Sequence, residues 1–366
     1  MGKYEAPSRK AEASGGNKKH IGLWIALAIL LVLVIWGIWF FTTPPSQAAP
    51  VGNNDIQTTQ PDDATQSGDA VQNPTDENGD PAPDDTVTTD PTQKEMKKGY
   101  YTILLAGTMD GVNTDTMMLC SVDSQNGKVK LVSVNRDTQV DAPITIPKIN
   151  AMYGWDGAET MCQKVTDVTG VPINYYVVID MTAFKEVIDM IGGVEYNVPF
   201  DMYHKDLNLD YHIDLKAGQQ TLDGSEALQF VRFRSTSEND FGRVNRQKDF
   251  LVAAMKQVLK KFSITQIEDY ITVFNENVDT NMSVQNMVWF LTNVVTKLDF
   301  AEDVTSDTLP YYTTGYWTNP NATKYKTQSY VYLDAQQIVE YVNENLNPYT
   351  TDITADELNI PRWIND

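Results

Sequence analysis

Arginine is scarce in this chain, and where it occurs it is concentrated. Only seven arginines are found in 366 residues, and four of them fall within residues 232–246. The formal net charge is −21, so the chain as a whole repels anions. Arginine presents planar, paired donors that match phosphate oxygens, whereas lysine offers a point charge. The cluster therefore indicates either a local phosphate site on an acidic protein or a set of ion pairs with the abundant carboxylates.

Cysteine is equally scarce, and Cys120 and Cys162 are the only two in the chain. Two cysteines permit a disulfide in an exported protein, but they do not establish one. Cys120 lies in an apolar strand pattern and Cys162 lies in a helical pattern. We therefore expect two buried free thiols.

Charged residues are absent from residues 21–41, which are almost entirely apolar. Twenty-one helical residues rise about 30 Å, the thickness of a bilayer's hydrocarbon core. Five basic residues precede this run, and the next one after it is Lys94. That asymmetry predicts a cytoplasmic tail over residues 1–20, one retained transmembrane helix over residues 21–41 and an exported remainder, which makes a single-pass cell-membrane protein.

A cleaved signal peptide is the alternative interpretation of this run, with Ser46-Gln47-Ala48 as its cleavage site. Secretory apolar segments are shorter, however, at about 7–15 residues. The cytoplasmic tail is too short for a helix-turn-helix unit, which argues against direct binding of nucleic acid.

Aromatic residues are absent from residues 42–98, where Pro, Asp, Thr, Gln, Asn and Gly dominate. Such a composition buries too little apolar surface to offset the entropy of ordering. We expect a disordered, acidic extracellular linker that extends by self-repulsion and lets the folded part stand off the membrane. Residues 99–366 are then the extracellular catalytic domain, which is long enough for one large core.

Apolar segments in the domain alternate between strand and helix patterns, which predicts a layered α/β fold. Strands are expected at 100–106, 115–123, 128–135, 174–180 and 329–332. Helices are expected at 157–169, 182–191, 243–262, 264–275, 284–297 and 335–345. The polar, tyrosine-rich segment 199–216 is expected to form a hairpin or flap.

Acidic residues and arginines gather in three places that a fold could bring together. They are Asp110 with Asp115, the pair Arg136-Asp137, and the cluster of Arg232, Arg234, Asp240, Arg243, Arg246 and Gln247. Arg232 and Arg234 would share one face of a strand, and Arg243 and Gln247 would share one face of a helix. Two carboxylates with several arginines suit a divalent cation and a diphosphate. Turns, strand ends and surface ion pairs explain the same residues without a site, and their spacing is not a metal signature.

Several separate blocks, in order, resemble the LytR–CpsA–Psr family of cell-wall glycopolymer ligases. The match runs over most of residues 104–247. The matching blocks are Leu105–Asp110, Thr114–Leu119, Ser133–Thr138, Lys148–Ala151, Gly192–Val194, Ala217–Leu228, Val231–Arg234 and Asp240–Gln247.

The resemblance implies a three-layer α/β/α sandwich with a mixed central sheet. It also implies a phosphotransferase that moves a phosphoglycan from a polyprenyl-pyrophosphate-linked donor to a peptidoglycan hydroxyl. The implied metal is Mg²⁺, held by Asp110 and Asp115. The implied catalytic residues are Asp115, Arg136, Arg232, Arg234, Asp240 and Arg243. The implied substrate-binding residues are Arg136, Arg232, Arg234, Arg243, Arg246, Gln247 and Lys148.

Two positions depart from the family pattern. Asn135 replaces a proline before the Arg-Asp pair, and Asn113 stands where the family usually has an arginine. One pyrophosphate contact is then missing or supplied elsewhere, for which Lys148 is a candidate. Two alternatives to the transferase stay open, namely a pyrophosphatase that uses water as the acceptor and a non-catalytic module that binds lipid-linked precursors and regulates envelope assembly.

Overall fold

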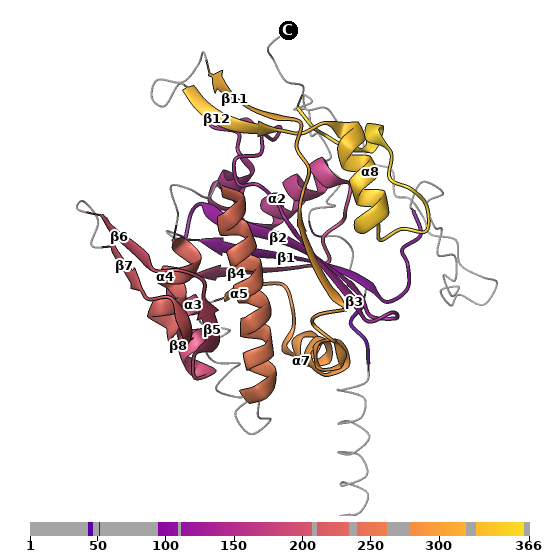
Figure 1. Cartoon of the computed structure of the whole chain (residues 1–366). Coiled ribbons are helices and arrows are strands. Elements are labelled where there is room, and N and C mark those ends of the chain that lie inside the picture. The colour runs from indigo at the N-terminus through magenta and orange to yellow at the C-terminus, as the bar shows by residue number, and fades with distance from the viewer. Residues whose placement is uncertain are drawn as a thin grey trace, which may run out of the picture.

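A six-stranded mixed sheet forms the centre of the protein (Figure 1). The computed structural model describes residues 43–46, 51, 94–108, 111–206, 211–233, 240–261, 278–319 and 327–361. The strand order is β10-β3-β2-β1-β4-β9. The strands are β1 (Tyr100–Thr108), β2 (Thr114–Asp123), β3 (Lys128–Ser133), β4 (Tyr175–Asp180), β9 (Val278–Thr280) and β10 (Val304–Thr308).

Strand direction in this sheet is mixed, which confirms the expected mixed central sheet. Strand β2 runs antiparallel to both β1 and β3, and β9 runs antiparallel to β4. Strand β1 runs parallel to β4, and β3 runs parallel to β10. A turn that contains Asn126-Gly127 joins β2 to β3, and Gly127 has a positive φ of 62°, which glycine adopts without a steric penalty.

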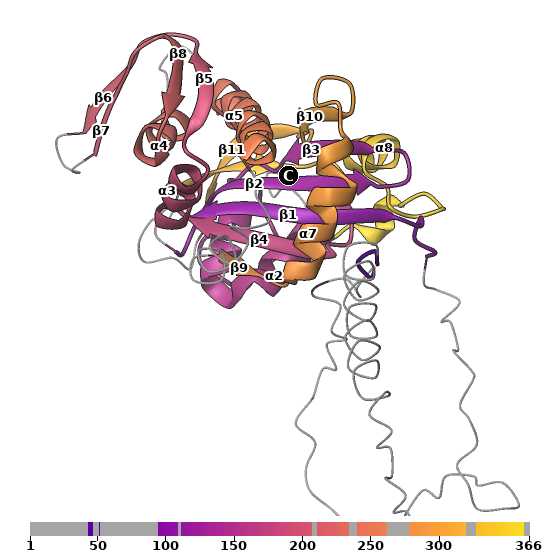
Figure 2. The same cartoon turned by 90° about the horizontal axis from the view of Figure 1, so that it is seen from below.

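Both faces of the sheet are buried, because alternate side chains of each strand point to opposite sides. Leu104 and Ala106 of β1 face a core that includes α2 (Met152–Thr169) and α8 (Ala335–Asn345). Tyr101 and Ile103 face a second core with α7 (Val284–Asn293) and part of α5 (Asp240–Lys261). Helices therefore cover the sheet from two sides, as Figure 2 shows.

A smaller unit with its own apolar core lies beside the sheet (Figure 2). Helix α5 joins this unit to the sheet, because Phe250 belongs to the smaller core while Leu251 packs against the sheet core. The unit contains α3 (Met181–Met190), β5 (Val194–Val198), β6 (Met202–Asp206), β7 (Tyr211–Leu215), β8 (Gly218–Leu222) and α4 (Gly224–Arg232). The β6–β7 pair confirms the hairpin expected over 199–216.

A separate hairpin of β11 (Thr313–Thr318) and β12 (Thr327–Tyr332) lies at the top of the view in Figure 1. No helix in the described ranges is long and apolar enough to cross a membrane. The expected span over 21–41 and the expected helix over 264–275 lie outside the described residues. Lys94–Gly99 already contacts the folded domain, through the pairing of Met96 with Tyr349.

The two thiols are free and buried, as expected. Cys120 belongs to the core on the α7 side of the sheet, and Cys162 belongs to the core on the α2 side. Burial raises the pKa of each thiol to about 12. Both thiols are therefore protonated at neutral pH, and they react slowly with alkylating reagents while the protein is folded.

Gly224 allows α4 to approach the backbone of α3. A Cβ atom at this position would lie 2.7 Å from the Cα atom of Lys185, which is closer than van der Waals contact. The backbone of α3 cannot easily move to relieve this overlap. We expect Gly224→Ala to lower the free energy of unfolding by about 1–3 kcal/mol through overpacking. Denaturant titration measures the change. Gly107→Ala is the matched control, because its added Cβ would meet only Thr116 at an ordinary 3.8 Å. An equal effect of both substitutions would contradict the close approach of α4 to α3.

Candidate active site

Charged side chains meet at the edge of the sheet where β3 ends and β2 begins. Asp115 is the second residue of β2, and Arg136 follows the end of β3. Arg136 donates from Nη1 to Asp115 Oδ1, and its Nε lies 4.0 Å from Asp137 Oδ2. The backbone bond from Val134 N to Met117 O, at 2.9 Å, continues the strand pairing up to this point. The two segments expected to meet do therefore meet.

Lys148 extends this charged group inward. Its Nζ donates to Asp137 Oδ1 at 2.8 Å and lies 5.3 Å from the centre of the Tyr330 ring. The side chain of Lys148 is only 11% exposed, so Asp137 is its charge partner in a largely desolvated place. The result is a row of alternating charges that runs Asp115, Arg136, Asp137, Lys148.

Tyr330 is a neighbour of the site that the sequence did not reveal. Its strand lies beside Asp137, because Val331 N donates to Asp137 O at 2.9 Å. Tyr330 is 1% exposed, and its hydroxyl has no hydrogen-bond partner within the described part of the chain. Burial, followed by Tyr332 and the Asp137 carboxylate, raises the pKa of Tyr330 to about 12. Tyr330 therefore stays a neutral donor at physiological pH.

Arg232 is the last residue of helix α4, and this corrects the expectation that Arg232 and Arg234 share one face of a strand. Helix α4 begins with a capping box in which Asp223 accepts from Glu226 N and Glu226 accepts from Asp223 N. Reciprocal capping fixes a helix start. Phe233 then leaves the helical conformation, and Arg234 lies outside the described residues.

Helix α5 carries the rest of the arginine cluster. Its backbone places Asp240 and Arg243 in the first turn, but their side chains lie outside the described atoms. Arg246 is 7% exposed and donates from Nη2 to Phe233 O at 2.8 Å. Its guanidinium lies 5.9 Å from the Phe200 ring centre and 5.7 Å from that of Phe233. Arg246 thus ties α5 to the end of α4 within the smaller unit, and a role in substrate binding stays a prediction.

Gln247 connects the arginine cluster to the charged row. Its Nε2 donates to Val231 O at 3.0 Å, and its Oε1 accepts from Thr116 Oγ1 at 3.3 Å. Thr116 is the residue after Asp115 in β2. The structure therefore brings the end of α4, the first half of α5 and the start of β2 together through one amide side chain.

Metal ligands are incompletely described at this edge. Asp115 is described, whereas Asp110 lies outside the described residues. In the described ranges no group of three or more His, Cys, Asp and Glu side chains could hold an ion. Mg²⁺ does not require such a group, because it commonly takes one or two carboxylates, water and phosphate oxygens.

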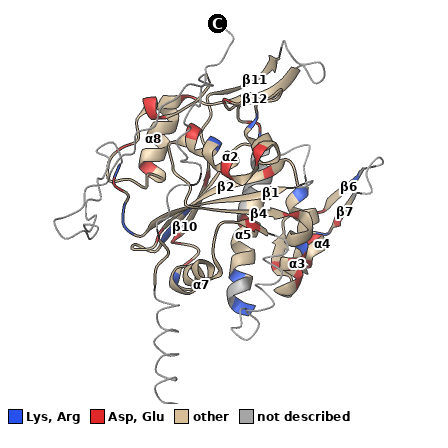
Figure 3. Ribbon diagram, turned by 180° about the vertical axis from the view of Figure 1, so that it is seen from behind, with Lys and Arg blue, Asp and Glu red and all other residues tan. Residues whose placement is uncertain are grey.

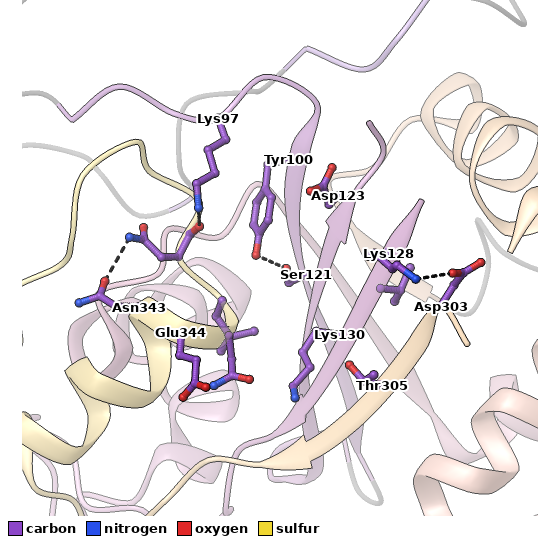
Figure 4. Close-up of a pocket in the computed structure, with 14 residues that line it drawn as sticks. Lys97, Tyr100, Ser121, Asp123, Lys128, Lys130, Asp303, Thr305, Asn343 and Glu344 are labelled. Atoms are coloured by element: carbon purple, nitrogen blue, oxygen red, sulfur yellow. Dashed lines mark hydrogen bonds and ion pairs between the residues drawn. The ribbon is translucent and has the colours of Figure 1, made fainter. Parts of the chain in front are cut away.

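A cleft of about 460 Å³ opens at the opposite end of the sheet (Figure 4). It is lined by the end of β2, the start of β3 and the C-terminal part of α8. Figure 4 shows Lys97, Lys128 and Lys130 around it with Asp123, Asp303 and Glu344. This cleft shares no residue with the charged row. Lys128 pairs with Asp303, Lys130 pairs with Asp307, and Lys97 donates to the carbonyl oxygen of Asn347.

Asp137→Asn tests whether Asp137 stabilises the buried Lys148. We expect the substitution to lower the free energy of unfolding by about 1–3 kcal/mol, because Lys148 keeps its charge and loses its partner. Denaturant titration at neutral pH measures this change. Asp141→Asn is the control, since Asp141 is an exposed carboxylate four residues further on. A neutral effect of Asp137→Asn would mean that the Lys148 ammonium does not depend on this contact.

The chain is similar in sequence and in fold to several known proteins. TagV of Bacillus subtilis (strain 168), a polyisoprenyl-teichoic acid–peptidoglycan teichoic acid transferase by name, is 33% identical over 202 residues, which cover 52% of each chain. TagU of Bacillus cereus, which bears the same kind of name, is 32% identical over 218 residues that cover 58% of this chain and 70% of the relative. The crystal structure of B. subtilis TagV superposes with a TM-score of 0.56 at 28% identity, covering 70% of this chain and 100% of that one.

The matched region spans about half the length of TagV. The family model described as the LytR_cpsA_psr family matches residues 64–347, which is most of this chain. This match includes the charged row, the capped helix α4 and helix α5. The chain belongs to the LytR-CpsA-Psr family.

Proposed function

We propose that this protein attaches a glycopolymer to the cell wall, by transferring a phosphoglycan from a polyprenyl-pyrophosphate carrier to a peptidoglycan hydroxyl. The observation that carries the proposal is Arg136, which stands at the sheet edge between the carboxylates of Asp115 and Asp137. The names of the relatives, which are teichoic acid transferases, support the same class of reaction.

In this reaction the acceptor oxygen attacks the phosphorus that carries the glycan. The bond from that phosphorus to the bridging diphosphate oxygen breaks, polyprenyl phosphate leaves, and the hydroxyl proton passes to a base. Negative charge grows on the departing phosphate, and fixed cationic donors lower the barrier by stabilising it. A phosphoryl transfer therefore needs a positioned cation more than it needs a covalent intermediate.

Arg136 meets this requirement, because its orientation is set before substrate arrives. A guanidinium carries five N–H donors, so contacts with two carboxylates leave donors for phosphate oxygens. Arg232, Arg234 and Arg243 are the proposed further contacts to the diphosphate, with Lys148 in the place of the arginine that Asn113 replaces. Asp240 and Gln247 are proposed to orient the pocket or the acceptor.

Asp115 fits the ligand set of a magnesium ion. One of its oxygens accepts from Arg136, and the carboxylate is a quarter exposed at the sheet edge. Asp115 would hold Mg²⁺ together with Asp110, and water and diphosphate oxygens would complete the set. A bound Mg²⁺ supplies positive charge that offsets the charge of the diphosphate.

A membrane anchor belongs to the same proposal. Residues 21–41 are long enough and apolar enough to span a bilayer, and the basic residues before them favour a cytoplasmic N-terminus. The protein would then be a single-pass membrane protein with its catalytic domain outside the cell. That location holds the enzyme at the surface where a lipid-linked donor resides.

Arg136→Ala tests the site. We expect transfer to fall by about 100-fold or more, because a positioned donor to the developing charge is lost. The assay follows glycan joined covalently to peptidoglycan fragments by mass spectrometry. Lys128→Ala is the control, because it removes an exposed cation from the opposite end of the sheet. Normal transfer by Arg136→Ala would exclude this edge as the active site.

The products of the unmutated protein distinguish the alternative functions. Release of free phosphoglycan would identify a pyrophosphatase, and the absence of both products would favour a regulatory role.

Removal of divalent cations tests the magnesium assignment. We expect a chelator to abolish transfer and added Mg²⁺ to restore it, since the diphosphate charge is otherwise only partly neutralised. Asp115→Asn should raise the Mg²⁺ concentration needed for half-maximal transfer by about 10-fold or more, because one charged oxygen ligand is lost. Turnover that is unchanged by the chelator would remove the metal from the proposal.

A further inference from the structure

The short segment Thr43–Ser46 lies against the folded domain, although it directly follows the apolar run. Pro45 is buried, and its carbonyl oxygen accepts a hydrogen bond from the Tyr101 hydroxyl at 3.1 Å. The carbonyl oxygen of Ser46 accepts from the Tyr175 hydroxyl at 2.8 Å. Tyr101 lies near the start of β1 and Tyr175 begins β4, so the segment is fixed to two neighbouring strands of the central sheet.

The two tyrosines are held in place by contacts that do not involve the segment. The ring centre of Tyr101 lies 5.1 Å from that of Phe290 and 5.9 Å from that of Trp289. Asn286 donates from Nδ2 to the Tyr175 hydroxyl at 3.2 Å. Helix α7 therefore holds both tyrosines in place without help from the segment. We call the hydroxyls of Tyr101 and Tyr175 the seat of the segment.

The chain touches the domain again at Val51 and at Lys94–Gly99. Val51 N donates to Ile173 O at 2.9 Å, and Lys97 N donates to Pro348 O at 2.7 Å. Val51 and Lys94, the described residues on either side of residues 52–93, therefore both lie on the folded domain. A segment with both ends on one body does not set the distance from that body to anything else.

We propose that the docked segment Thr43–Ser46 fixes the domain to the bilayer on its α7 side, so that the length of the chain between Val51 and Lys94 does not set the distance from the domain to the bilayer. The inference rests on the proposed membrane anchor at residues 21–41. Only Thr42 separates that run from the segment. Pro45 and Ser46, which make the two hydrogen bonds, lie four and five residues after Phe41. Because one residue spans at most about 3.6 Å, these contacts lie within roughly 18 Å of the end of the span.

The surface that this docking turns toward the bilayer is rich in lysine. Lys260 and Lys261 lie in the last turn of α5, where Lys260 pairs with Glu195 at 3.0 Å. Lys297 is exposed shortly after α7, and the exposed Asp299 and Glu302 follow it. Lys256 lies 5.4 Å from the ring centre of Phe300, which joins α5 to the segment after α7. Figure 3 shows basic residues at the lower end of α5 and beside α7. In a chain of net charge −21, this placement suits anionic lipid headgroups, which attract each nearby lysine by about 1 kcal/mol.

Energy transfer to the bilayer tests the docking in the full-length protein. The protein is reconstituted in vesicles that contain anionic lipid and acceptor-labelled lipid, and a donor dye is attached at Thr296→Cys. Both native thiols are buried, so the exposed introduced cysteine takes the label. We expect high transfer from this position and low transfer from Tyr316→Cys, which is 75% exposed on β11.

Doubling the stretch 52–93 tests whether its length sets the distance from the domain to the bilayer. The span of a flexible tether grows as the square root of its length, so doubling would lengthen it about 1.4-fold and lower the transfer. When Thr43–Ser46 is unmutated, we expect the doubling to leave the energy transfer unchanged. Pro45→Asp should undock the segment, lower the transfer and make it depend on loop length. Pro44→Asp is the matched control, because Pro44 is exposed.

Two outcomes would overturn the inference. One is transfer that falls on loop doubling in the unmutated protein, and the other is an equal effect of Pro44→Asp and Pro45→Asp. Failure of the unmutated protein to float with vesicles would refute the anchor itself, which is a separate observation. Glycan transfer in detergent needs the proposed active site but not the docking of Thr43–Ser46, so a failed docking test and a failed enzyme assay are distinguishable. Unfolding curves of the two proline variants confirm that the fold is retained.

Discussion

The antiparallel pairing of β2 with both of its neighbours decides where the chemistry of this protein can occur. It brings the start of β2 to the edge where β3 ends, so Asp115 and Arg136 meet although the turn that joins β2 to β3 lies at the far end of the sheet. Asp137 and Lys148 then hold the arginine from the other side. Arg136 retains its charge and direction because each cation in this row has a carboxylate beside it, and a positioned cation is what phosphoryl transfer demands.

Much of the sheet could be predicted, because its strands are apolar runs bounded by turns. The first four strands and the hairpin over 199–216 appear where the pattern places them. Strands β9, β10 and β11 were missed, because they lie at sheet edges or outside the main sheet and carry mostly polar residues. The helical state of Arg232 was also missed, although the capping residues Asp223 and Glu226 are a signal in the sequence that predicts it. Tyr330 could not be found from the sequence, since only the pairing of Val331 with residues 137–139 brings it to the site.

The arginine cluster shows why residue counts do not separate binding from structure. Arg136 lies at an accessible edge and contacts carboxylates, whereas Arg246 is buried between aromatic rings and caps a backbone carbonyl. Arg136, which lies outside the cluster, fits the ion-pair explanation, whereas the contacts described for Arg246 are with a backbone carbonyl and two aromatic rings. The surroundings of a side chain on α5 depend on which side of the helix it occupies. Gln247, one position after Arg246, reaches the sheet edge through Thr116, while Arg246 enters the smaller core.

Composition predicted that residues 42–98 cannot fold alone. It does not tell whether such a segment separates the expected membrane span from the folded domain or begins and ends on the domain. The segment Thr43–Ser46 docks at the starts of β1 and β4, and the charged row lies at the other end of the sheet, beyond the end of β3. The nine residues of β1 separate the two by about 30 Å. A domain fixed in this way would hold the proposed diphosphate site at one height above the bilayer. A lipid-linked donor moves only in the plane of the membrane, so a site at fixed height meets every donor that diffuses past. A site on a long flexible tether would spend most of its time elsewhere, and its effective concentration would fall with the length of the tether. The proposed docking of four residues would therefore change the rate of encounter without any new contact to the substrate.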